Sequence, residues 1–208
     1  MSWRRSIRTA ADKPSTPAVA GSGNGLNAGA FLDIEEILRR VRPVSTSLAS
    51  AFHGEDHWRE VASIGLDLAQ STPGCDEIVV LLFAVLHDAR RIGDDHDPPH
   101  GGRGAALVRS LGLGRFGLSE TQLALAETAC RDHTGGGLSA DPTIGTCWDA
   151  DRLTLRRVGI EPAARYMSTP TGRAAAASGQ RFACVTDWSD LARRVRGPSP
   201  LARSPRQR

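Results

Sequence analysis

The sequence contains few aromatic residues and almost no lysine. Aromatic side chains make up 5% of the 208 residues, and Lys13 is the only lysine, so arginine carries nearly all of the positive charge. No run of eighteen apolar residues is present, which argues against a helix that crosses a membrane. The apolar share of 40% nevertheless allows one domain of ordinary size to bury a core.

The cysteines form no C-x-x-C pair. They are widely spaced, at Cys75, Cys130, Cys147 and Cys184. Their mostly apolar neighbours favour reduced, buried thiols over disulfides or a zinc knot. The arginines near the N-terminus are not followed by the apolar segment of a signal peptide, so we expect a cytoplasmic protein.

The net charge of +3 is unevenly distributed. Residues 1–30 carry a net charge of +3, residues 193–208 carry +6, and the remainder, 31–192, carries −6. A uniformly basic surface for specific binding of nucleic acid is therefore excluded, although the arginine-bearing ends could touch anionic partners non-specifically.

The composition also divides the chain. Residues 9–30 are rich in small and polar residues, and residues 197–208 read GPSPLARSPRQR. Such segments cannot bury enough apolar surface to offset chain entropy. We expect a disordered N-terminal segment at 1–30, one domain at 31–195 and a disordered basic tail at 196–208.

Between the ends the apolar periodicity is helical, which predicts an all-α fold. Asp76, the Ser119–Gln122 pair and Asp141 before Pro142 are typical helix starts. The expected helices cover residues 32–42, 55–70, 78–86, 100–111, 120–133 and 142–157, with one or two more in 162–195. The segment 78–86 is apolar on every side and should form the buried centre.

All six histidines lie between residues 53 and 133. On the expected helices, successive elements each contribute a group that can bind a metal, namely His57, His87 with Asp88, His100, His133 and Asp149. Helical bundles build metal sites from side chains that project inward from several helices.

The His87–Asp88 pair is the most informative of these because it ends an apolar helix. An unpaired carboxylate there would be costly, and a divalent cation removes that cost. Imidazole nitrogen together with carboxylate oxygen suits Mn, Fe, Co, Ni or Zn.

An ordered set of motifs resembles the HD-domain superfamily of metal-dependent phosphohydrolases. The motifs span about residues 33–165 and read H57-W-R-E-V61-A, L86-H87-D88, H100-x-x-x-G104, D132-H133 and W148-D149-A-D151-R-L153. The resemblance implies an HD-like helical bundle. It also implies one metal held by His57, His87, Asp88 and Asp149. Relatives with two metals use two further histidines, matched by His100 and His133, with Asp88 bridging.

The chain departs from that pattern at two places. Asp132 precedes His133 and no Gly-Tyr-Pro follows, which argues against cleavage of cyclic di-GMP. Thr154 stands where relatives often have an aspartate.

Several residues keep two interpretations. His53 shares a helical face with His57 and is either a surface or capping residue or a partner of the site. His96 is expected in a solvated loop. Asp149 and Asp151 cannot face the same way on one helix, and the resemblance selects Asp149 as the ligand, leaving Asp151 to pair with an arginine. Trp58 and Trp148 are expected to pack in the core beside the ligands.

The residues and the resemblance together predict hydrolysis of a small phosphorylated substrate, a nucleotide or another phosphate ester, by one or two divalent metal ions. Asp88 would orient the attacking water or take its proton, and Arg103 and Arg152 would bind phosphate oxygens. The sequence predicts neither a membrane nor a specific nucleic acid as partner. Two alternatives are an HD-type di-iron oxygenase and a non-catalytic metal-binding module.

Overall fold

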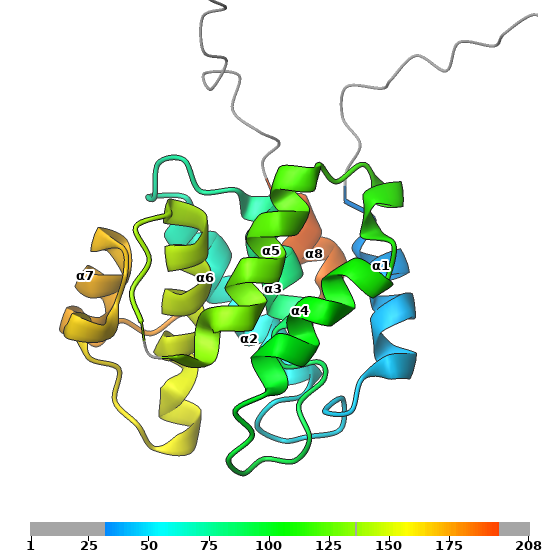
Figure 1. Cartoon of the computed structure of the whole chain (residues 1–208). Helices are drawn as coiled ribbons and strands as arrows, with labels where there is room; N and C mark the ends of the chain where they lie inside the picture. The colour runs from blue at the N-terminus through cyan, green and yellow to red at the C-terminus, as the bar shows by residue number, and fades with distance from the viewer. Residues whose placement is uncertain (1–31, 136, 196–208) are drawn as a thin grey trace, which may run out of the picture.

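The computed structural model describes residues 32–135 and 137–195, which lie within the expected domain. Every regular element in this part of the chain is helical, which confirms the all-α fold (Figure 1). The segments 1–30 and 196–208, for which we expected disorder, lie outside the described residues.

The α-helices follow the expected order, with small shifts at their ends. Their bounds are α1 (Ile34–Val41), α2 (Glu55–Ala69), α3 (Glu77–Leu86), α4 (His100–Ser110), α5 (Glu120–Asp132), α6 (Pro142–Leu153), α7 (Pro170–Ser178) and α8 (Trp188–Arg194). Short 3-10 segments are η1 (Arg42–Val44), η2 (Leu113–Phe116), η3 (His133–Gly135), η4 (Thr154–Val158) and η5 (Ala164–Tyr166). The region 162–195 therefore holds two helices, and α6 ends at Leu153, four residues before the expected end.

Local side chains start the helices as expected. The Asp76 carboxylate accepts hydrogen bonds from the backbone N–H groups of Ile78 and Val79, at 3.0 and 3.2 Å. Ser119 and Gln122 form a complete capping box at the start of α5. These side chains satisfy N–H groups that the first helical turn leaves without partners.

The central helix is α3, whose residues from Val79 to Leu86 are fully buried. It contacts α1, α2, α4, α5 and α6, while α7 packs on α6 at one side of the molecule and α8 packs on α1 and α2 behind α4 and α5 (Figure 1). The periphery of the bundle therefore encloses one apolar core around α3.

Two glycines let α4 lie close to its neighbours. A Cβ atom at Gly101 would lie 2.7 Å from the carbonyl oxygens of Cys130 and Arg131, and one at Gly104 would lie 2.8 Å from that of His87. Both distances are shorter than a carbon–oxygen contact allows. The start of α4 is therefore held against the ends of α3 and α5.

Residues 32–135 and 137–195 contain no disulfide and no helix that could span a membrane. All four cysteines are unpaired; Cys130 and Cys147 are buried, Cys75 is half-buried and Cys184 is exposed. In the part of the chain that the structure describes, no helix combines the length and apolarity needed to cross a bilayer.

Candidate metal centre

Five helices bring histidine and aspartate side chains to one buried cluster. His57 lies in the first turn of α2, His87 and Asp88 directly follow the last residue of α3, and His100 begins α4. His133 follows α5, and Asp151 lies near the end of α6. These side chains are at most one-fifth exposed, and the histidines and Asp88 are less than one-tenth exposed. The cluster therefore lies in the core and does not depend on a surface loop.

The Asp88 carboxylate has a different set of partners at each oxygen. On the side of its Oδ2 atom, the Nε2 atoms of His57 and His87 lie 3.6 and 3.5 Å away and 3.2 Å from each other. Asp151 completes this group, with Oδ1 at 3.4 Å from His57 Nε2 and 3.8 Å from His87 Nε2. We call these four residues the Oδ2 side.

The other carboxylate oxygen faces two more histidines. Asp88 Oδ1 lies 3.1 Å from His100 Nε2 and 3.7 Å from His133 Nε2, and the two Nε2 atoms are 3.0 Å apart. We call these three residues the Oδ1 side. Asp88 therefore lies between two groups of nitrogen and oxygen atoms and belongs to both.

Backbone carbonyls fix the tautomers of three of these histidines. His87 Nδ1 lies 3.1 Å from the carbonyl oxygens of Phe83 and Ala84, and His133 Nδ1 lies 2.7 Å from that of Cys130. His100 Nδ1 contacts the Asp97 carbonyl oxygen in the same way. A carbonyl oxygen only accepts, so each Nδ1 carries a proton and donates it to the backbone, and each Nε2 atom faces the cluster.

The arrangement brings ring nitrogens and a carboxylate oxygen into close contact on the Oδ1 side. Asp88 Oδ1 is buried and has no hydrogen-bond partner among the described residues, although His100 Nε2 is close. The Nε2 atoms of His100 and His133 converge with this oxygen. A cation satisfies such a group, and nitrogen and carboxylate ligands suit a divalent transition metal.

The electrostatics differ within the cluster: burial acts to lower the pKa of His133, but its contact with Asp88 raises it. Burial lowers the pKa of His87 to about 4, so its imidazole is neutral at neutral pH. Burial acts to raise the pKa of Asp88, but the surrounding histidines hold it well below its usual range. His57 and His87 lower the pKa of the Asp151 carboxyl in the same way, against the effect of burial.

The structure corrects the assignment of Asp149 as a ligand. Its fully buried carboxylate accepts hydrogen bonds from the backbone N–H of Ser168 at 2.6 Å, and from the N–H and hydroxyl of Thr169, both at 2.8 Å. Residues two apart on a helix differ by about 200° in direction, so Asp149 and Asp151 point to opposite faces of α6. Asp151, for which we expected an arginine partner, therefore takes the position beside the histidines.

The two arginines predicted to bind substrate donate hydrogen bonds within the protein. Arg103 bonds to the Arg90 carbonyl oxygen and the Asp97 carboxylate. Arg152 bonds to the carbonyl oxygens of Tyr166 and Gly137, at 2.7 and 2.6 Å. Their contact with substrate stays a prediction.

A third arginine contacts the cluster directly. One terminal nitrogen of Arg91 lies 3.0 Å from Nδ1 and 3.2 Å from Nε2 of His100, so its guanidinium lies against this imidazole. The Arg91 Nε atom is buried and has no hydrogen-bond partner among the described residues. The sequence pointed to Arg103 and Arg152 for contact with phosphate and gave no signal that selects Arg91.

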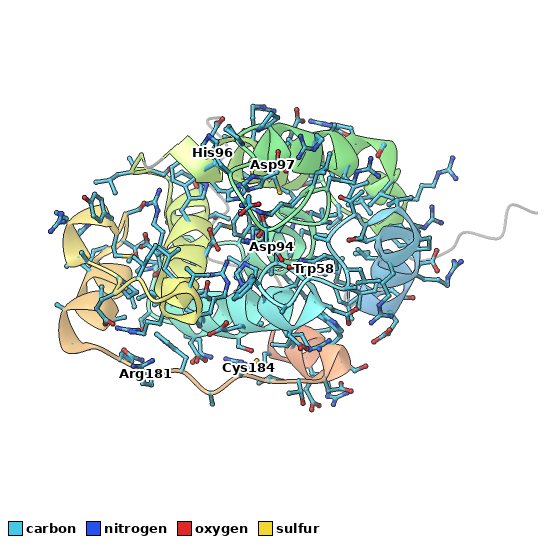
Figure 2. The ribbon with its side chains drawn as sticks, turned by 90° about the horizontal axis from the view of Figure 1, so that it is seen from below. Trp58, Asp94, His96, Asp97, Arg181 and Cys184 are labelled. Atoms are coloured by element: carbon cyan, nitrogen blue, oxygen red, sulfur yellow. The ribbon has the colours of Figure 1, made fainter. Side chains whose placement is uncertain are left out.

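The two remaining histidines have different surroundings. His53 Nδ1 lies 2.8 Å from Asp88 Oδ2, so His53 belongs to the cluster. Its spacing of four residues from His57 was the signal for this. His96 is exposed on the loop that also carries Asp94 and Asp97, as expected (Figure 2).

Both tryptophans beside the ligands are buried. Trp58 is fully buried and its Nε1 donates to the His53 carbonyl oxygen at 2.9 Å, while Trp148 Nε1 donates to the Ala129 carbonyl oxygen at 3.0 Å. Their indole N–H groups thus have partners in the core, which agrees with the expected packing role.

The chain was compared with known proteins, and no family model, curated protein or solved structure matches it.

Proposed function

We propose that this protein is a metal-dependent phosphohydrolase of the HD type, with two divalent cations bound on the two sides of Asp88. One observation carries the proposal: the Nε2 atoms of histidines whose Nδ1 atoms contact backbone carbonyls converge with a buried carboxylate oxygen that has no hydrogen-bond partner. The order of the ligands along the chain supports the HD-type assignment, with Asp151 in the place first given to Asp149.

The Oδ2 side offers two imidazole nitrogens and two carboxylate oxygens, and the Oδ1 side offers two nitrogens and the second oxygen of Asp88. When bound, divalent cations lower the pKa of water from 15.7 to about 7 and neutralise charge on phosphoryl oxygens. The low pKa of Asp88 favours a role in orienting the attacking water over a role in accepting its proton.

The protein side chains supply the remaining recognition. The Arg91 guanidinium, beside His100 and with an unpartnered buried N–H, is placed to donate to a phosphate oxygen. Because residues 31–192 carry a net charge of −6, a phosphate ester needs such local positive groups to approach. We therefore propose a small phosphate ester, a nucleotide or a similar metabolite, as the substrate.

The test combines metal analysis of the purified protein with a hydrolysis screen. Phosphate monoesters and diesters would be offered in the presence of Mn, Fe, Co, Ni or Zn. We expect turnover with at least one metal and its loss, by at least about 100-fold, in D88N and D88A, because Asp88 belongs to both sides of the centre.

The matched control is D95A, which alters an exposed acidic residue on the neighbouring loop and should leave turnover unchanged. Turnover that survives in both Asp88 variants would refute the proposal. Oxygen uptake by the iron-loaded protein, without phosphate release, would establish the di-iron oxygenase instead.

A further inference from the structure

His53 lies next to the proposed metal ligands but has a different relation to Asp88. Its Nδ1 atom is 2.8 Å from Asp88 Oδ2, within hydrogen-bond distance, whereas the Nε2 atoms of His57 and His87 are 3.6 and 3.5 Å from that oxygen. Among the histidine contacts of the Asp88 carboxylate within residues 32–135 and 137–195 it is the shortest; the next is His100 Nε2, at 3.1 Å from Oδ1. The ring of His53 is largely buried, so water competes little for the contact.

The backbone of His53 is fixed on both sides. Its N–H donates to Ser50 Oγ at 2.9 Å, and its carbonyl oxygen accepts from the indole of Trp58. Ser50 Oγ in turn donates to Asp94 Oδ1, so this chain of contacts runs from Trp58 to Asp94, both labelled in Figure 2. The imidazole is therefore presented to Asp88 from a rigid position.

The turn before α2 is too tight for most residues. A Cβ atom at Gly54 would lie 2.4 Å from the Ser50 carbonyl oxygen. Ser47 Oγ, from the same turn, donates to the Asp88 carbonyl oxygen at 2.8 Å. The segment from Ser47 to Gly54 thus holds both the main chain and the side chain of Asp88.

We propose that His53 is a positioning residue that sets the rotation of the Asp88 carboxylate by donating its Nδ1 proton to Oδ2. The terminal torsion of an aspartate is soft, so an unsupported carboxylate samples a broad range of angles. With the hydrogen bond in place, Oδ2 faces His57 and His87 while Oδ1 faces His100. This inference rests on the proposed metal centre, because it concerns how a shared ligand is oriented.

His53 could instead be a ligand itself, since ligand atoms of His53, His57 and Asp88 lie within 4.8 Å of one another. Two substitutions of similar size separate these roles. The amide nitrogen of asparagine occupies the place of Nδ1 and can donate to Asp88, but an amide nitrogen does not ligate a metal. The amide nitrogen of glutamine occupies the place of Nε2 and leaves Oδ2 without its donor.

The experiment titrates metal-free wild type, H53N, H53Q and H53A with Co²⁺, following the visible absorption of the bound ion and the heat of binding. Loss of a hydrogen-bond partner of a metal ligand typically weakens binding about 10- to 100-fold. We expect that loss, with a changed Co²⁺ spectrum, in H53Q and H53A, and affinity within about threefold of wild type in H53N. H96A, at an exposed histidine, is the control for removing an imidazole.

The proposal is overturned if all variants bind Co²⁺ as tightly as wild type. It is also overturned if H53N binds Co²⁺ as poorly as H53A, because His53 would then be a ligand. Thermal unfolding of each variant in EDTA reports whether the fold is kept. If the wild type binds no Co²⁺, the metal centre itself is refuted. If the wild type binds Co²⁺ but H53N does not regain that affinity, only the positioning role is refuted.

Discussion

Asp149 and Asp151 show how two identical side chains on one helix acquire different tasks. Asp149 receives three hydrogen bonds from Ser168 and Thr169 and holds that segment against α6. Burial raises the pKa of its carboxyl, whereas the pKa of Asp151 is lowered beside the histidines. The first carboxylate supports the fold and the second completes the cluster.

The corresponding variants should separate stability from metal binding. In D149N the new amide group meets backbone donors, so we expect a loss of about 2–3 kcal/mol in the free energy of unfolding with metal affinity retained. In D151N we expect metal affinity to fall at least about tenfold, with unfolding of the metal-free protein changed by less than about 1 kcal/mol. Urea unfolding and Co²⁺ titration measure the two quantities. The reverse pattern would restore Asp149 as the ligand.

Most of the candidate centre could be predicted at the level of single residues. The His87–Asp88 pair attracted attention because it ends an apolar helix, and helical spacing placed His57, His100 and His133 at element ends. The choice between Asp149 and Asp151 could not be made from local sequence. It depends on which face of α6 the Ser168–Thr169 segment covers, and that is set by packing between residues about twenty positions apart.

At the level of elements, the position of α4 connects packing to the cluster. His100 begins this helix, and Gly104 brings its first turns against the carbonyl oxygens of Leu86 and His87. A larger residue at position 104 must push α4 away from the end of α3. That movement would also separate His100 from Asp88.

Gly102 and Gly104, both in α4, provide a matched pair of variants. In G104A the new methyl group would meet two carbonyl oxygens at 2.8 and 2.9 Å, so we expect a loss of about 1–3 kcal/mol in stability and weaker metal binding. In G102A nothing lies within 4 Å of the new Cβ, so the better helix propensity of alanine should stabilise the protein by up to about 1 kcal/mol. Thermal unfolding measures both. Equal effects would show that α4 is not tightly packed here.

The helix starts were predictable because their signals are local. Asp76, Ser119 and Asp141 each bond to N–H groups two or three residues ahead. The end of α6 was not predictable from local signals. There the chain turns into η4 at Thr154, whose hydroxyl donates to the Asp151 carbonyl oxygen at 2.6 Å. The apolar periodicity continues through this change and does not mark it.

At the scale of the whole molecule, the cluster joins five helices that are separated along the chain. The candidate ligands come from α2, the ends of α3 and α5, the start of α4, and α6, so the unfolded chain holds no preformed site. A ligand that binds only the folded state stabilises it by mass action. Metal binding should therefore be visible as stability of the entire domain.

We expect Zn²⁺ or Co²⁺ at about 100 times its dissociation constant to add about 2.7 kcal/mol to the free energy of unfolding. For a domain of this size, that gain raises the melting temperature by about 5–10 °C. EDTA should reverse the shift, and D88N should show little of it. A shift of the same size in D88N would mean that the metal binds elsewhere. Scanning calorimetry with and without metal gives the answer.

The position of Asp88 has a consequence for how the two sides of the centre fill. One carboxylate presents an oxygen to each side, so we expect a cation on one side to alter the charge and orientation of Asp88 that the other side meets. Such coupling is reciprocal by thermodynamic necessity: the factor by which a first ion changes the affinity for a second equals the factor in the opposite order. For the two cations that we propose, we expect cooperative loading, positive or negative, with a binding isotherm that departs from that of two independent sites.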